Sequence, residues 1–472
     1  MAFLWTSFQF RYEVHNDQLL SIDQPEIVRQ GEGFSISLFF ELNGKVETVN
    51  ITVSRWKEDP SPEWAAHAAV ILGLPVAMAA GLPMQVNFPV SIRLLSSLQD
   101  IQEMLSAWNK ELSVIEVKAD PMTIRVDKSR EGQTATFFSG GVDSFHTLHR
   151  HLDHIEHAVF VHGFDIPLSK VELRSEVSAH LRKATEAMGV NLIEVETNVR
   201  DLSDRFCHWG SHYCGAAMAA VAYVFGGDLS RVFIPATMTL THMGGFGTHP
   251  MLDPKWSSEA LEIVHEGLDT RRIDKIRQLP DVALKHLRVC WENLNGKYNC
   301  GRCEKCIRTL ANLRALAITE KCPTFDRQLD LRKLEALELD HPLVEAFLIE
   351  TREEAEIQKD HELAAAVSKC LAEYHGKRLL HDVRKWKGGL FKDSRSDKVV
   401  RRIRDQVFDD AVKDNPEWVM KEYGKMFPDH RSALFDIFWK RERKWLLGRV
   451  LRERLMRSLR HVIPGLGRPR EQ

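Results

Sequence analysis

The sequence predicts an α/β protein whose central domain is built on a parallel sheet. Short apolar runs alternate with helical patterns from about residue 129 to residue 325, which is typical of buried strands joined by helices. Strand-like alternation dominates before this segment, and charged amphipathic patterns without strand signals follow it. At 472 residues the chain is too long for one ordinary core. We therefore expect a β-rich α+β module over 1–128, a parallel-sheet domain over 129–325 and a helical region over 326–472.

The N-terminal module is expected to contain strands and two helices. The strand patterns cover 8–14, 34–42 and 46–56, with turns at 30–33 and 43–44, and the helical patterns lie near 62–72 and 95–109. No chemical motif stands out here, so a structural or partner-binding role is the expectation.

One apolar stretch, Trp64–Met84, is long enough to raise the question of a membrane span. Gly73, Pro75 and Pro83 interrupt it, and much of its apolar content is alanine. We therefore interpret it as a buried helix, begun by Ser61-Pro62-Glu63 and followed by a turn, with no membrane span. The N-terminus has neither a basic start nor a small-residue cleavage site, so we expect a cytoplasmic protein.

The central domain contains four recognisable strands. They are expected over 134–138, 158–161, 192–195 and 232–234. Between the second and the third we expect a helix that is capped at Ser169, with Glu172 completing a capping box, and that ends at Gly189. Sheets of this kind have helices on both faces and bind ligands beyond the carboxyl ends of their strands.

The first of these strands runs directly into the hexamer Ser139-Gly-Gly-Val-Asp-Ser144, and a helical pattern follows. Two glycines allow the loop to turn its amides inward, and the helix adds its free N–H groups and the positive end of its dipole. Ser139 and Ser144 can donate their hydroxyls to phosphate oxygens. Asp143 is expected to hold Mg²⁺, directly or through water, because a carboxylate does not favour bare phosphate. Strand, tight loop and helix together predict a phosphate site.

The hexamer resembles the PP-loop motif of the ATP pyrophosphatase superfamily. It is not a Walker loop, because no Gly-Lys-Ser/Thr follows it. The resemblance implies that ATP is cleaved between its α and β phosphates, with Ser139, Asp143 and Ser144 as catalytic residues. It also implies that the end of the second strand lies near the adenine and ribose. The implied nucleotide-binding residues are Ser139, Gly140, Gly141, Val142, Asp143, Ser144, Gly163, Phe164 and Asp165.

Four of the eight cysteines, Cys290, Cys300, Cys303 and Cys306, are crowded into one short segment. Four thiolates at this spacing suit tetrahedral Zn²⁺, and a closed four-cysteine zinc site is normally structural. An iron–sulfur cluster is the alternative. The glycine loop followed by this cluster resembles the 7-cyano-7-deazaguanine synthases over roughly residues 133–312. That resemblance implies ATP, Mg²⁺ and Zn²⁺ as cofactors and a 7-deazaguanine-like base as the small-molecule acceptor.

The segment after the fourth strand is rich in glycine and in hydrogen-bonding side chains. We expect His249, Asp253, Trp256 and Ser257 to bind the acceptor there, with the indole stacking on a flat ring. An ordinary packing role is equally open for each of them alone. The segment lacks the Asp-Tyr-Ser-Gly-Tyr character of the deazaguanine synthases, so the activation chemistry carries over better than the identity of the acceptor.

The main functional hypothesis is an ATP-dependent ligase. It adenylates a carboxylate or amide-like oxygen of the acceptor, and then forms an amide or nitrile or attaches the base to a macromolecule. One alternative is an RNA-modifying enzyme that forms lysidine or thiolates through Cys207 or Cys214, and another is a nucleotide-sensing scaffold without turnover. The whole chain has a net charge of −2, but twelve Lys or Arg face four Asp or Glu from Arg431 to Gln472. This tail, or the N-terminal module, could therefore bind an RNA or protein partner. A homodimer is a further possibility.

Overall fold

The computed structural model describes residues 18–124, 132–240, 244–326, 328–339 and 342–374. The chain divides into two compact units, and the described residues up to 238 and from 244 to 372 all belong to the first. The second unit takes in 239–242 and 373–472, so it lies almost wholly outside the described residues. The expected strand over 8–14 and the basic tail also fall outside them.

Five parallel strands form one end of the sheet, in the order β13-β12-β9-β10-β11. Their bounds are β9 Gln133–Phe137, β10 His157–His162, β11 Asn191–Thr197, β12 Leu229–Pro235 and β13 Glu262–Glu266. The four predicted strands are confirmed as β9 to β12. The sequence did not reveal β13, because its five residues include a glutamate at each end and only two apolar residues.

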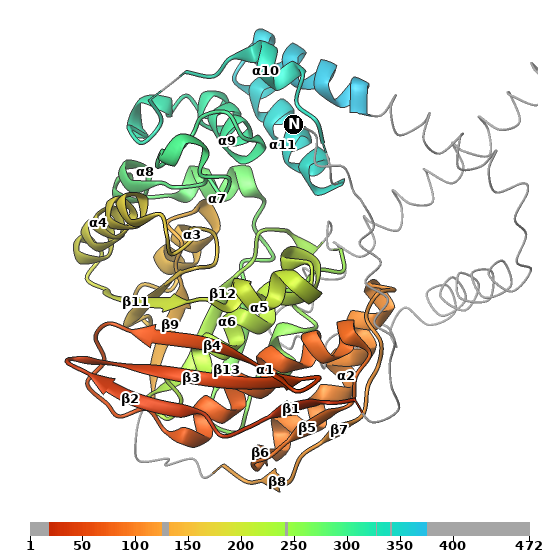
Figure 1. Cartoon of the computed structure of the whole chain (residues 1–472). Helices are drawn as coiled ribbons and strands as arrows, with labels where there is room; N and C mark the ends of the chain where they lie inside the picture. The colour runs from red at the N-terminus through yellow and green to blue at the C-terminus, as the bar shows by residue number, and fades with distance from the viewer. Residues whose placement is uncertain (1–17, 125–131, 241–243, 327, 340–341, 375–472) are drawn as a thin grey trace, which may run out of the picture. The chain divides into compact units, whose positions relative to one another are not determined.

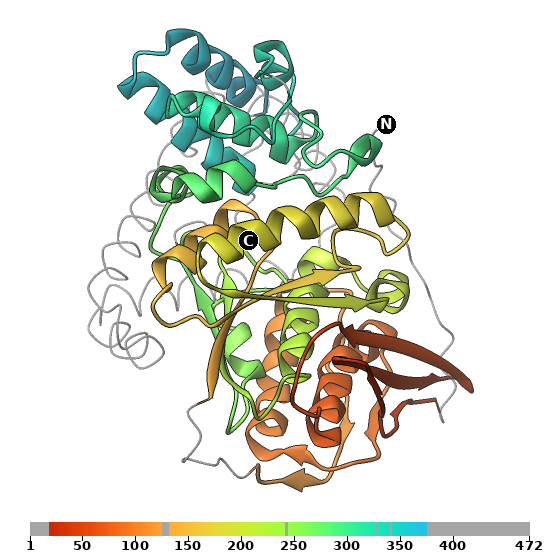
Figure 2. The ribbon, with the colours of Figure 1, turned by 90° about the vertical axis from the view of Figure 1, so that its left-hand side faces the viewer.

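The two faces of these strands pack against different sets of helices (Figure 1). Side chains such as Phe137 and Val159 join the core that contains α1 (Pro62–Ala80) and α6 (Cys214–Tyr223). Their neighbours Phe138 and Phe160 join the core on the other face, with α3 (Val142–Arg150) and α4 (Val171–Ala187). Figure 2 shows α4, in yellow, lying between the strands and the green helices that follow β13. The predicted parallel sheet with helices on both faces is therefore confirmed.

The N-terminal strands extend this sheet rather than forming one of their own. β4 pairs antiparallel with β11, Val53 opposite Val195, so the hydrogen-bonded sheet continues across the boundary expected near residue 128. The complete sheet has eleven strands, ten of them along one path and β2 paired with β3 beside it. The added strands are β1 Leu20–Ile22, β2 Glu26–Gln30, β3 Gly33–Leu42, β4 Lys45–Val53, β5 Met84–Val86 and β7 Val117–Lys118, and β6 Val90–Ser91 pairs with β8 Pro121–Met122 in a separate small sheet.

Helix α1 is longer than the sequence pattern suggests. It begins as predicted, with the Ser61 side chain accepting a hydrogen bond from the Glu63 N–H, but it runs through Gly73 and Pro75 to Ala80. The predicted buried helix and following turn are confirmed, with the turn at Gly81, but the helical pattern expected near 62–72 ended too early. Burial overrides the two helix breakers: a Cβ on Gly73 would come within 2.6 Å of the Ile22 side chain, and the Tyr213 hydroxyl donates to the Leu72 carbonyl beside the proline.

The same helix bears on the question of a membrane span. Among the described residues, α1 is the helix that is long and apolar enough to cross a membrane, but 83% of its apolar window is buried inside the protein. Its apolar surface is thus covered by the chain itself, as expected for a core helix.

The remaining helices follow the predicted order with small shifts. α4 starts one residue later than expected, with Lys170 as its N-cap and no side-chain cap, because Lys170 N–H bonds the Pro167 carbonyl in a turn; the Ser169 capping box was therefore wrong. The others are α2 Ile92–Trp108, α5 Val199–Phe206, α7 Arg272–Gln278, α8 Asp281–His286, α9 Glu304–Ala315, α10 Leu331–Glu335, α11 Pro342–Ile357 and a helix that starts at residue 361. Beyond residue 326 the described residues form helices and turns without strands, as expected.

Gly226 offers a test of the core shared by α1 and the sheet. A Cβ at this position would lie 1.9 Å from the Trp64 ring, so Gly226→Ala forces α1 or the turn to move. We expect a loss of about 1–3 kcal/mol in the free energy of unfolding, measured by urea titration. The matched control is Gly210→Ala, whose Cβ would meet its nearest neighbour at 3.6 Å. Equal stability of the two variants would contradict the packing described here.

Candidate functional site

The candidate site lies where the connections of the parallel sheet diverge. In chain order the five strands run 3-2-1-4-5 across the sheet, so β9 is flanked by β10 on one side and β12 on the other. The chain leaves β9 at the Ser139 loop and leaves β12 at Pro235, and both line one pocket at the carboxyl ends of the strands. In open α/β sheets this divergence opens a crevice in which ligands bind.

The Ser139–Ser144 loop has the backbone geometry that an anion site requires. Gly140 has φ +72°, and a Cβ there would come within 2.6 Å of Leu181 on α4, so this position favours glycine for two reasons. The Ser144 hydroxyl accepts from the Gly141 N–H and donates to the Gly141 carbonyl, each at 3.1 Å. Helix α3 starts at Val142, so its first-turn amides have no partner inside the helix. The loop therefore presents N–H groups and hydroxyls to the pocket.

A separate pocket beside this loop, called the anion pocket below, is lined by three cationic side chains: Arg272, Arg288 and Lys305. Arg272 and Arg288 are 2% and 3% exposed, and the Nε of each is buried without a hydrogen-bond partner in the described part of the chain. Two carboxylates, Asp143 and Asp165, line the same pocket. Buried guanidinium groups are stabilised by opposite charge, so a pocket lined by two of them and by Lys305 suits an anion.

Asp143 is held by two cations. Its Oδ2 accepts from Arg272 Nη1 at 2.9 Å, and its Oδ1 lies 3.6 Å from Lys275 Nζ. Burial alone would raise the pKa of Asp143, but the charges of Arg272, Lys275 and Lys305 outweigh it and lower the pKa to about 2. Burial in turn lowers the pKa of both Arg272 and Lys275. The carboxylate is therefore ionised and already neutralised within the protein.

These contacts do not favour direct ligation of Mg²⁺ by Asp143, and a role through water stays a prediction. A cation at this carboxylate would have to displace Arg272 or lie beside it, at a cost in charge repulsion. The exposed Asp165 is the one other carboxylate that lines the pocket in the described residues. One free carboxylate is a weak Mg²⁺ site without substrate phosphates to complete it. The donors of the pocket thus suit an anion better than a metal ion.

The expected adenine and ribose segment, Gly163 to Asp165, lies against the glycine loop. Gly163 has φ +98°, and a Cβ there would collide with the Thr197 carbonyl at 1.8 Å, so the chain can turn here only with glycine. The turn places Phe164 and Asp165 in the pocket that Ser139 and Pro235 line at the carboxyl ends of β9 and β12. This pocket is largely apolar and also contains Ser144. The full lining is Phe137, Phe138, Ser139, Ser144, Val159, Phe160, Val161, Phe164, Asp165, Ile166, Trp209, Cys214, Met218 and Pro235.

Trp209 is the aromatic residue of this apolar pocket that the sequence did not single out. Its ring packs edge-on to Phe164 with the centroids 5.0 Å apart, and the Arg200 guanidinium lies 4.5 Å from its centroid. Arg200 also donates to the Phe164 carbonyl at 3.3 Å. Trp209 sits in a short π-helix, Trp209–Tyr213, a local irregularity for which sequence patterns give little signal.

The residues expected to bind the acceptor do not line either of these two pockets. Asp253 is fully buried, accepts from the Thr248 hydroxyl at 2.6 Å and lies 2.7 Å from His265 Nδ1. Trp256 is also fully buried. The Ser257 hydroxyl accepts from the Ile263 N–H at 3.0 Å. These contacts are those of a packed loop.

His249 has a comparable environment. It is 8% exposed, its ring packs on Trp108 with the centroids 4.7 Å apart, and its Nδ1 accepts from the Met251 N–H. Burial, with a smaller contribution from His265, lowers its pKa to about 4. It is therefore a neutral imidazole at physiological pH.

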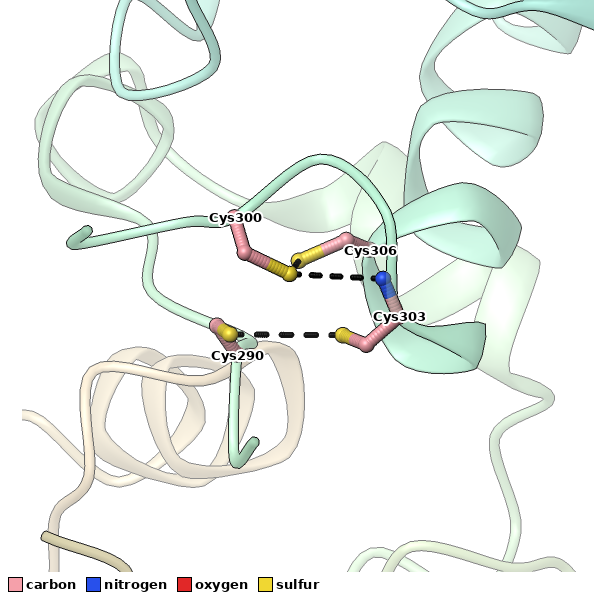
Figure 3. A group of neighbouring side chains, drawn as sticks. All are labelled: Cys290, Cys300, Cys303 and Cys306. Atoms are coloured by element: carbon pink, nitrogen blue, oxygen red, sulfur yellow. Dashed lines mark hydrogen bonds between the residues drawn. The ribbon is translucent and has the colours of Figure 1, made fainter. Parts of the chain in front are cut away.

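The four clustered cysteines converge as predicted (Figure 3). All four are buried, and their sulfur atoms lie within 4.8 Å of one another. The Cys290–Cys303 and Cys300–Cys306 sulfur distances are 4.0 and 3.8 Å. Tetrahedral Zn²⁺ with Zn–S bonds of about 2.3 Å places sulfurs about 3.8 Å apart. The Arg302 and Cys303 N–H groups also donate to Cys300 Sγ. The cluster fits a closed, structural Zn²⁺ site.

The cysteine cluster adjoins the anion pocket. Cys290 lines that pocket, Arg288 stands two residues before it, and Lys305 lies between the ligands Cys303 and Cys306. A bound Zn²⁺ would tie the Cys290 segment to the start of α9 and so fix both cations. Sequence reasoning missed Arg272 and Arg288, since charged residues are mostly exposed and nothing local marks these two as buried. The position of Lys305 between two ligand cysteines was the one available signal.

Metal analysis tests the cysteine cluster. We expect one zinc per chain by mass spectrometry of the purified protein, and we expect Cys306→Ser to lose most of it together with several kcal/mol of stability. Cys322→Ser is the matched control, because Cys322 is also buried but lies outside the cluster. Iron together with visible absorption would contradict the zinc assignment and favour an iron–sulfur cluster.

Glu350 of α11 gives a pH-dependent prediction. It is 6% exposed and accepts from the Ile273 N–H at 3.1 Å, and burial raises its pKa to about 7. Because a raised carboxyl pKa disfavours the ionised form in the folded protein, stability should be lost as the pH rises from about 5 to 8. Glu350→Gln should therefore gain up to about 3 kcal/mol relative to wild type over this range, measured by urea unfolding at several pH values. A difference that does not change with pH would contradict the raised pKa.

Comparison with known proteins gives no relative for this chain. No protein-family model matches it. No curated protein matches it, and no solved structure matches it either. The function proposed below therefore depends on the residues of the site and on their geometry.

Proposed function

We propose that the chain is an ATP-dependent ligase that cleaves ATP between its α and β phosphates and adenylates an acceptor oxygen. The observation that supports this most is the anion pocket at the Ser139–Ser144 loop. Loop amides, two hydroxyls, the buried cations Arg272 and Arg288 and the partly exposed Lys305 line it. A departing pyrophosphate is the most highly charged product of such a reaction, and positioned cations stabilise its developing charge.

The apolar pocket beside it provides for the rest of the substrates. Its aromatic side chains suit a flat base, and Ser139, Ser144 and Asp165 belong to both pockets, so groups bound in the two would meet at the loop. An acceptor carboxylate or amide-like oxygen attacking the α phosphate there would form an acyl or imidoyl adenylate. Ammonia or an amine would then displace AMP. The acceptor class, a 7-deazaguanine-like base free or attached to a macromolecule, comes from the sequence resemblance alone.

The thiolation alternative has less support. Cys207 is 7% exposed with its Sγ directed at the Pro75 carbonyl, and burial raises the pKa of its thiol far above the ordinary value. Cys214 lines the apolar pocket, but burial raises its pKa to about 12. A sulfur-transfer enzyme needs a thiolate, and neither cysteine supplies one near neutral pH. A scaffold that binds nucleotide without turnover remains the second candidate, and the following experiment separates it from the ligase.

Product analysis tests the proposal. Zinc-bound, full-length protein is incubated with Mg²⁺·ATP and a panel of acceptors, and nucleotides are separated by HPLC. We expect AMP and pyrophosphate in the presence of the right acceptor, and a loss of activity on the order of 100-fold in Arg288→Ala, because one transition-state donor is removed.

The matched control is Arg231→Ala. Arg231 is half-exposed, pairs with Glu262 and lies outside the pocket, so its loss should leave turnover within about twofold. ADP and phosphate as products would refute the ligase proposal. Tight ATP binding without turnover for any acceptor would favour the scaffold.

A further inference from the structure

Helix α11 packs on α7 and α9, which carry the pocket residues Arg272 and Lys305, although it lies outside the segment that carries the family resemblance. Phe347 of α11 is 6% exposed. The guanidinium carbons of Arg272 and Arg308 lie 5.6 and 4.5 Å from the centroid of its ring. Both distances are within the range of cation–π contacts, which strengthen when the groups are removed from water.

These two arginines need such a partner. Both are 2% exposed, and burial, with a smaller contribution from the charge of Arg308, lowers the pKa of Arg272. Glu304 pairs with Arg308, and Asp143 pairs with Arg272. Because like charges at short range repel in a medium of low dielectric constant, the negative face of the Phe347 ring favours the arrangement in which both stay buried.

A second contact from α11 fixes the backbone that presents Arg272. The carboxylate of Glu350 accepts from the N–H of Ile273, the residue that follows Arg272 at the start of α7. α11 is itself anchored to α9, since the Thr351 hydroxyl donates to Asn312 Oδ1 at 2.5 Å. α9 also provides Lys305 and the ligand Cys306. The backbone and the side chain of Arg272 are thus each held by one residue of α11.

We propose that Phe347 and Glu350 are positioning residues that orient the Arg272 guanidinium toward Asp143 and the phosphate pocket. The proposal depends on the proposed function in one respect, that the anion is the pyrophosphate part of ATP. It assigns a role to α11, for which the sequence offered only a helical pattern. The pocket is then complete only when α11 is packed on α7.

The test measures the affinity of full-length, zinc-bound protein for inorganic pyrophosphate by isothermal titration calorimetry, with the KM for ATP alongside. Phe347→Leu should weaken pyrophosphate binding at least tenfold. In an Arg272→Ala background the same substitution should cause no further loss, because Phe347 acts through Arg272. Phe40→Leu is the matched control: it removes a buried ring from β3, away from the pocket, and should leave the affinity unchanged.

Zinc content and thermal melting check that each variant is folded. If Phe347→Leu does not fold, Glu350→Ala serves as the second variant, with the same expected loss and the same dependence on Arg272. Affinity equal to wild type in a folded variant overturns the positioning role while leaving the ligase proposal intact. Pyrophosphate binding that follows the expected pattern without ATP turnover supports the positioning role and refutes the ligase. A wild-type protein that binds no pyrophosphate overturns both.

Discussion

The site depends on an excess of buried positive charge around one short loop. Arg272, Arg288 and Lys275 are almost fully buried, and the Asp143 carboxylate is shared by two of them. Removing charges from water is costly, and a protein retains such a cluster when an opposite charge is bound there or when the surroundings compensate. The glycine loop, the cysteine cluster and helix α11 each contribute to that compensation from a different part of the chain.

The elements that carry these cations are distant in sequence but pack against one another. α7 carries Arg272 and Lys275, the segment before Cys290 carries Arg288, and α9 carries Lys305. Cys290 and α9 would be joined by one metal ion, and α11 packs on both α7 and α9. Disturbance at any of these contacts would therefore reach the anion pocket, even though only a few residues line it. Such an arrangement is rigid because each part is fixed by at least two others.

The sequence predicted the parts of this fold that are marked by local chemistry. β9 to β12 were recognisable as apolar runs, the Ser139–Ser144 loop by its glycines, and the metal cluster by cysteine spacing. β13 was missed because it is short and acidic at both ends, and α1 was cut short because Gly73 and Pro75 are tolerated only by tertiary packing. Arg272 meets Asp143 across 129 positions of sequence, a pairing that no local pattern reveals. Acceptor recognition by His249, Asp253, Trp256 and Ser257 stays a prediction, since their observed contacts are those of a packed loop.

The pairing of β4 with β11 limits how this chain can be divided. If residues 1–128 were removed, β11 would become an open edge strand, and the apolar face that α1 covers would meet water. An exposed edge of this kind is a template for pairing with other molecules, and exposed apolar faces promote the same outcome. A shortened chain that keeps the glycine loop and all four clustered cysteines would thus be prone to aggregate during expression. The N-terminal strands thus cover the edge and one face of the parallel strands.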